Sequence, residues 1–69
     1  MEKPVVHTEL LDEITSLMAA TGLSKPDFGR AVLNDPRLVY DMEQGRELRR
    51  TTEARVREKM ASLKAEASA

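Results

Sequence analysis

Side chains suited to directional hydrogen bonding follow one another near the middle of the chain, between Pro36 and Gln44. Arg37 carries a planar guanidinium, which can bond both acceptors on the edge of a guanine base. Tyr40 and Asp41 come three and four residues later, so on a helix they share a face with Arg37. Asp41 can accept a hydrogen bond from a cytosine amino group. The candidates for contact with the bases of duplex DNA are therefore Pro36, Arg37, Tyr40 and Asp41.

These side chains also have structural interpretations, which the sequence leaves open. Arg37 can contact a phosphate, or pair with Asp41 one helical turn later. Tyr40 can contact a base or a phosphate, or pack its ring over the rim of the motif. Asp41 can orient Arg37 without touching a ligand.

Basic side chains that suit phosphate oxygens flank this stretch. The connection RELRRT, residues 46–51, contains the densest positive charge of the chain. Lys25 lies at the start of a predicted helix, where the positive helix end also favours phosphate. The expected phosphate contacts are Lys25, Gln44, Arg46, Arg49 and Arg50. The alternative is that residues 46–51 form a solvated loop.

Two short amphipathic helices joined by a tight turn are predicted to carry these residues. Ser24 is a good N-cap for the first helix, because its hydroxyl can accept a bond from a first-turn backbone N–H. Phe28, Ala31 and Val32 then fall on one helix face. Gly29 inside this helix costs about 1 kcal/mol relative to Ala. A position without a side chain has a use here, because it lets the second helix approach the first closely and cross it at a steep angle.

The second helix is expected over residues 35–44. Asn34 precedes it and can adopt the left-handed conformation that ends the first helix. Asp35 is the expected cap of the second helix. Val39 and Met42 mark its buried side, and the side chains of Arg37 and Tyr40 lie opposite them.

Another helix is expected to begin at Thr8 as its cap and to end at Gly22. Its apolar stripe consists of Leu10, Leu11, Ile14, Leu17 and Met18. A stripe this wide is typical of a helix that buries one face against its neighbours. His7, the only histidine, is expected to be a solvated side chain, because a metal site needs more ligands.

The last helix is expected to begin at Thr52 as its cap. Its narrow apolar stripe consists of Val56, Met60, Leu63 and Ala67. The steps of four, three and four resemble the seam of a coiled coil. We expect Met60 and Leu63 to form a dimer interface. The alternative is that this helix packs only on its own domain.

The motif FGR…DPR…V…GR…T…RV runs along the chain as Phe28-Gly29-Arg30, Asp35-Pro36-Arg37, Val39, Gly45-Arg46, Thr52 and Arg55-Val56. With it, the stretch from Leu23 to Gly45 resembles the helix-turn-helix of the lambda-repressor-like family, of the phage-repressor and Cro type. The nearest resemblance is to short bacterial and prophage regulators, and it covers Leu10 to Leu63. It implies an all-α fold of four, or at most five, helices, in which Phe28, Val32, Val39 and Met42 occupy core positions.

The expected organisation is one small domain. A flexible arm over residues 1–7 precedes a DNA-binding domain over residues 8–65, which contains the motif at 24–45, and residues 66–69 form a frayed tail. A chain of 69 residues buries only about 60% of its unfolded surface, so dimerisation would help its stability.

Composition excludes several classes of protein. The chain has no cysteine, so neither a disulfide framework nor a thiolate metal site is available. It has no His–carboxylate pairing at helical spacing, no nucleophile elbow and no Gly-rich phosphate loop, so we expect neither an enzyme nor a cofactor. No apolar run approaches the roughly 20 residues of a membrane span, and no signal-peptide pattern is present. The expected location is the cytoplasm, in association with the nucleoid.

Charge is distributed unevenly although the net charge is only −1. Residues 1–24 contain one Lys against four acids, whereas residues 36–64 contain eight Lys and Arg against five acids. This asymmetry aims one end of the domain at a polyanion. An ordinary mixed surface is the alternative.

Together these features predict sequence-specific binding of duplex DNA by a small transcriptional regulator, with repression as the default. The helix over 35–44 would enter the major groove, and a homodimer would bind two half-sites. The alternative function is a protein-interaction module, an antitoxin or an anti-regulator, built on the same helices. The net negative charge and Asp41 favour that alternative.

Overall fold

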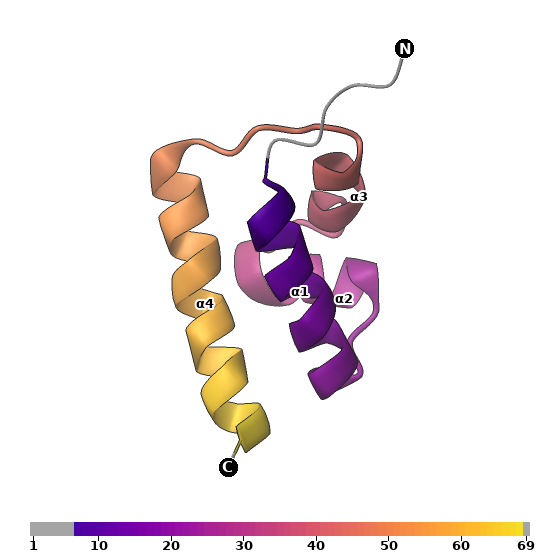
Figure 1. Cartoon of the computed structure of the whole chain (residues 1–69), viewed down its shortest axis with the longest axis vertical. Coiled ribbons are helices and arrows are strands. Elements are labelled where there is room, and N and C mark those ends of the chain that lie inside the picture. Colours follow the sequence, from indigo (N-terminus) through magenta and orange to yellow (C-terminus); the bar gives the residue numbers. More distant parts are fainter. Residues whose placement is uncertain (1–6, 69) are drawn as a thin grey trace.

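Residues 7–68 fold into four α-helices. The structure, a computed structural model, describes residues 7–68, so the expected arm lies outside the described residues except for His7. The helices are α1 (Thr8–Thr21), α2 (Lys25–Leu33), α3 (Leu38–Glu43) and α4 (Arg50–Ser68). No strand is present among residues 7–68 (Figure 1). The prediction of an all-α fold is therefore confirmed.

Local signals set the ends of the first two helices. Gly22 ends α1 in the left-handed conformation, with φ 76°, and its N–H donates to the Met18 carbonyl at 2.8 Å. The cap of α1 is His7 rather than Thr8, which is its first helical residue. At the start of α2, the Ser24 hydroxyl accepts from the Asp27 N–H at 3.3 Å, as expected of an N-cap.

Apolar side chains from all four helices and from one connection meet in a single core. Its buried members are Leu10, Ile14, Leu17, Phe28, Val32, Leu38, Val39, Met42, Leu48, Val56 and Met60. Phe28 is completely buried and is the largest of them. Ala31, which the helical spacing grouped with Phe28, is exposed instead. The core thus follows the predicted apolar faces of the helices, with the small side chains of Ala31 and Ala67 left outside.

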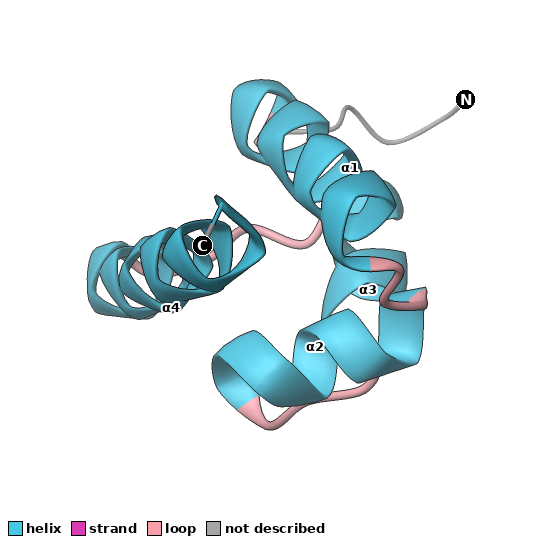
Figure 2. Cartoon of the chain, turned by 90° about the horizontal axis from the view of Figure 1, so that it is seen from below, coloured by secondary structure: helices cyan, strands magenta, loops and turns pink. Residues whose placement is uncertain are grey.

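The helices surround this core in a slightly elongated domain of 42 × 23 × 20 Å. The two longest helices, α1 and α4, pack against each other, and α2 packs on both α3 and α4. Seen from below, α4 lies on one side and α1 and α2 on the other (Figure 2). No helix of residues 7–68 combines the length and the apolar character needed to cross a membrane.

His7 connects the start of α1 to the segment between α3 and α4, and its prediction as a solvated side chain is wrong. Its Nε2 accepts a hydrogen bond from the Leu48 N–H at 2.9 Å, and its Nδ1 lies 3.5 Å from a Glu53 carboxylate oxygen. The side chain is only 16% exposed. This contact joins residues 41 positions apart, which no local sequence pattern reveals.

Candidate functional site

The turn between α2 and α3 is closely packed. Asn34 adopts the left-handed conformation, with φ 56°, and its N–H donates to the Arg30 carbonyl at 3.0 Å. Gly29 is buried beside this turn, and a Cβ added there would collide with the Asp35 carbonyl and lie 3.4 Å from the Leu38 Cβ. The close approach predicted at Gly29 is therefore present, and the atoms nearest to this glycine belong to the backbone of the turn, at Asp35.

The helix that follows is shorter than predicted, since α3 spans Leu38–Glu43 rather than residues 35–44. The prediction that Asp35 is the cap of this helix is wrong, because Arg37 occupies the N-cap position of α3 without a side-chain capping bond. Asp35 Oδ1 instead accepts from the Arg37 N–H at 3.0 Å, inside the turn that precedes the helix. Its carbonyl, however, accepts from the Leu38 N–H at 3.2 Å, a bond that spans three residues. Pro36 and Arg37 therefore form a tight turn in front of α3 instead of its first α-helical turn.

One side of α3 anchors it to the core. Leu38, Val39 and Met42 are at most 3% exposed, which confirms the predicted buried side. On the other side Arg37 is exposed, and Tyr40 is 47% exposed, the one exposed large hydrophobic side chain among the described residues. A six-residue helix is too short to be stable alone. Its position is therefore set by these three buried side chains and by the contacts of its outer face.

Arg46, which follows α3, is bonded to the turn that precedes this helix. Its Nη1 donates to Asp35 Oδ2 at 2.9 Å and lies 3.5 Å from Asp41 Oδ2. The hydrogen bond from Arg46, followed by that from the Arg37 backbone N–H, lowers the pKa of the Asp35 carboxyl below its ordinary value. Asp41 thus pairs with Arg46 and not with Arg37, which has no ion pair with any residue from 7 to 68. We call the cluster of Asp35, Asp41 and Arg46 the Arg46 bridge.

Lys25 is also engaged within the domain. Its Nζ contacts both Glu43 carboxylate oxygens, at 2.8 and 2.9 Å, and lies 5.3 Å from the centre of the Tyr40 ring. The hydrogen bond to Glu43 raises the pKa of the Lys25 ammonium above its ordinary value. This contact fixes the start of α2 against the outer face of α3. Sequence reasoning missed Glu43, because its partner is 18 residues away.

The remaining candidates for phosphate contact are exposed. Arg49 lies at the end of the connection and Arg50 is the first residue of α4, and neither forms an ion pair within the described part of the chain. Gln44 is exposed at the end of α3. Because α4 begins at Arg50, three residues before the start at Glu53 that a Thr52 cap implies, the Glu53 N–H donates to the Arg49 carbonyl at 2.8 Å. Thr52 is therefore a helical residue and not the cap.

The two residues expected at a dimer interface both face their own domain. Met60 is 8% exposed and belongs to the core, and Leu63 is half-buried against it. Residues 7–68 contain no cluster of three or more His or acidic side chains placed to hold a metal ion. The arrangement offers an exposed face of α3 with exposed arginines beside it.

Comparisons of the chain with protein-family models, with curated proteins and with solved structures give no match.

Proposed function

We propose that the chain binds duplex DNA in a sequence-specific manner through a helix-turn-helix formed by α2, the turn at 34–37 and α3, and that it acts as a small transcriptional repressor. In this proposal α3 enters the major groove with its N-terminal end nearest the base edges. Arg37 bonds a guanine edge, and Tyr40 contacts a neighbouring base or phosphate.

The observation that carries the proposal is the two-sided character of α3. Leu38, Val39 and Met42 are sealed in the core, whereas Arg37 and Tyr40 are exposed. A base-contacting helix needs both properties, because it must be held rigidly from behind while its outer side chains remain available. Arg37 also stands at the N-cap position of α3 with its guanidinium unpaired among residues 7–68.

Contacts to the DNA backbone would come from Arg49 and Arg50. Both are exposed and unpaired within the described chain, and they follow α3 by a short connection. Lys25 and Arg46 have a different role in this proposal, because each is bonded to carboxylates that hold α3. Phosphate contacts position a protein on DNA, and base contacts select the sequence.

The test is selection of duplexes from a library with a randomised core, followed by anisotropy titrations of the selected duplex at several salt concentrations. We expect enrichment of one sequence and an affinity that falls linearly with salt on logarithmic axes, because bound arginines release counterions from DNA. The proposal is contradicted if no sequence is enriched, or if the affinity for the selected duplex does not change with salt concentration.

A second candidate function is binding of a protein partner through the same face. The observation that favours it is the neutralisation of two basic residues near α3, since Lys25 is bonded to Glu43 and Arg46 to Asp35. Fewer free cations remain there to attract a polyanion. Purification of the chain from its host with one stoichiometric protein and no nucleic acid would select this candidate over DNA binding.

A further inference from the structure

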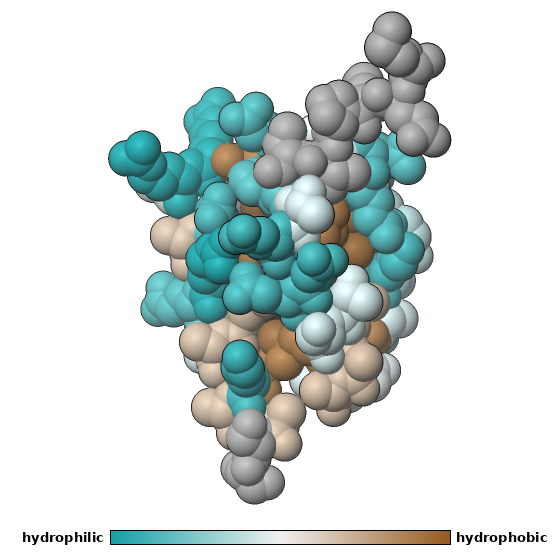
Figure 3. All heavy atoms as spheres, viewed as in Figure 1, coloured by the Kyte–Doolittle hydropathy of each residue, from teal (hydrophilic) through white to brown (hydrophobic). Residues whose placement is uncertain are grey.

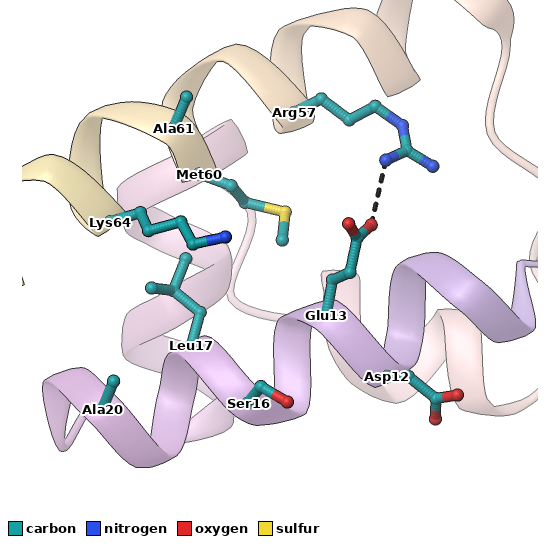
Figure 4. Close-up of a pocket in the computed structure, with 9 residues that line it drawn as sticks. All are labelled: Asp12, Glu13, Ser16, Leu17, Ala20, Arg57, Met60, Ala61 and Lys64. Atoms are coloured by element: carbon teal, nitrogen blue, oxygen red, sulfur yellow. Dashed lines mark hydrogen bonds and ion pairs between the residues drawn. The ribbon is translucent and has the colours of Figure 1, made fainter.

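A groove opens between α1 and the C-terminal half of α4. Its volume is about 640 Å³. Leu17 and Met60 line it and are the two most exposed residues of the core, at 7% and 8%. The small side chains of Ala20 and Ala61 lie beside them (Figure 4). In the space-filling view, apolar surface is visible in the lower half of the domain between the two helices (Figure 3). Such walls let another helix approach closely.

The charges around the groove are arranged on a diagonal. Near the Asp12 end of the groove, Arg57 of α4 donates to Glu13 of α1 at 2.9 Å and to Glu53 of its own helix at 3.0 Å, so two carboxylates share its charge (Figure 4). Asp12 and Lys64 lie at diagonally opposite corners, one on each helix (Figure 4). Both are exposed, and neither forms an ion pair with a residue from 7 to 68.

We propose that a second copy of this chain occupies the groove, packed groove to groove about a two-fold axis. In a two-fold interface residue i contacts residue j of the partner, and j contacts i in return. The two-fold axis would lie in the plane of the interface and cross the line from Asp12 to Lys64. It would then bring each Asp12 beside the Lys64 of the second copy, with Leu17 and Met60 near the centre of the interface. The acid and the base at the two corners are therefore complementary to a second copy.

This interface differs from the one predicted on Met60 and Leu63 alone, because it needs both α1 and α4. Dimerisation through this groove requires no DNA. A monomeric chain would therefore leave the proposed DNA binding standing, and a chain that binds no DNA would leave the proposed dimer standing. Burial of the groove walls supplies the apolar contact, and the two ion pairs select the two-fold arrangement.

Sedimentation equilibrium of the full chain without DNA, over a range of protein concentrations, tests the proposal. We expect reversible dimerisation. Asp12→Lys and Lys64→Asp should each weaken the dimer by about tenfold or more, since like charges then meet across the axis. The double variant should restore the wild-type dissociation constant. Lys59→Asp, on the same helix but outside the groove, is the matched control and should change nothing.

Steric blocking gives an independent measurement. Ala61→Arg places a long charged side chain inside the groove, and Ser62→Arg places the same side chain on a part of α4 that does not line it. Both positions are exposed, so both variants should keep the helical circular dichroism of the wild type. We expect only Ala61→Arg to be monomeric. The proposal is overturned if the wild type is monomeric, or if Ala61→Arg leaves the dimer dissociation constant unchanged. It is also overturned if the charge-swapped double variant dimerises no more tightly than the single variants.

Discussion

Arg46 donates from Nη1 to the Asp35 carboxylate at 2.9 Å, and so joins the segment that follows α3 to the residue that caps the turn before it. Asp35 in turn accepts from the Arg37 N–H with its other carboxylate oxygen, at 3.0 Å. The backbone position of Arg37, the proposed base-contacting arginine, is therefore held through Asp35 by a side chain from the segment that follows α3. Arg46 acts here as a positioning residue, in contrast to Arg49, which is unpaired within residues 7–68.

The first prediction separates positioning from phosphate contact. Arg49→Gln should reduce the slope of log affinity against log salt by about one, because one phosphate contact is lost. Arg46→Gln should leave that slope unchanged and reduce the preference for the selected sequence over random duplex. Anisotropy titrations at several salt concentrations measure both quantities. Equal losses of slope in the two variants would show that Arg46 contacts phosphate after all.

The second prediction concerns acid. The pKa of Asp35 is lowered in the folded chain. Stabilisation from the Arg46 bridge is therefore present above the unfolded aspartate value of about 3.9 and is lost as pH falls through the lower folded value. The effect should be less than about 1 kcal/mol, because the pair is partly exposed and screened by solvent. Asp35→Asn should remove this part of the pH dependence.

Urea unfolding at a series of pH values between neutral and acid measures the effect. Glu47→Gln is the control, since Glu47 is exposed, has no ion pair among residues 7–68 and does not line the groove. The Asp35→Asn variant should differ in stability from the wild type at neutral pH and approach it in acid. A difference that stays constant across the whole pH range would contradict the assignment to the charged carboxylate.

The third prediction tests the packing of the turn. Gly29→Ala raises helix propensity by about 1 kcal/mol, yet the new Cβ would collide with the Asp35 carbonyl. Overpacking of this kind costs about 1–3 kcal/mol. We expect net destabilisation by urea unfolding, together with weaker DNA binding because the turn must shift. Gly22→Ala is the comparison: its φ is 76° but no atom lies within 4 Å of the new Cβ, so it should cost stability without altering DNA binding.

Several elements were predictable because their signals are local. Ser24 as an N-cap, Asn34 as the left-handed end of α2 and Gly22 as the end of α1 each act within a few residues. The buried side of α3 followed from helical periodicity. The start of α3 could not be predicted in this way, because an Asp-Pro pair is compatible with either an α-helical turn or a tighter turn.

The contacts that hold the candidate site could not be predicted. Lys25 bonds Glu43 across 18 residues, and His7 bonds Leu48 across 41. Such pairs depend on how the helices pack, and a single sequence carries no record of that. For the same reason the basic candidates for phosphate contact divide into paired and unpaired side chains only once the fold is known.

The fourth prediction concerns the contact between His7 and the backbone of Leu48. His7→Ala removes the acceptor of the Leu48 N–H, which lies in a part-buried setting. Leaving a buried donor unsatisfied costs about 1–3 kcal/mol. Hydrogen exchange of the Leu48 amide should accelerate, while that of Gly45, bonded to the Met42 carbonyl at 3.1 Å, serves as the internal reference. Unchanged exchange at Leu48 would contradict the contact.

Whether the exposed face of α3 selects a DNA sequence is measured by the ratio of specific to random-duplex affinity, compared between Arg37→Ala and the wild type. We expect this ratio to fall by about tenfold to a hundredfold, since a bidentate contact to guanine discriminates by about 1–3 kcal/mol. Arg55→Ala, which removes an exposed arginine of α4, should leave the ratio unchanged. A ratio that is the same for Arg37→Ala and the wild type would mean that this face of α3 does not select the sequence.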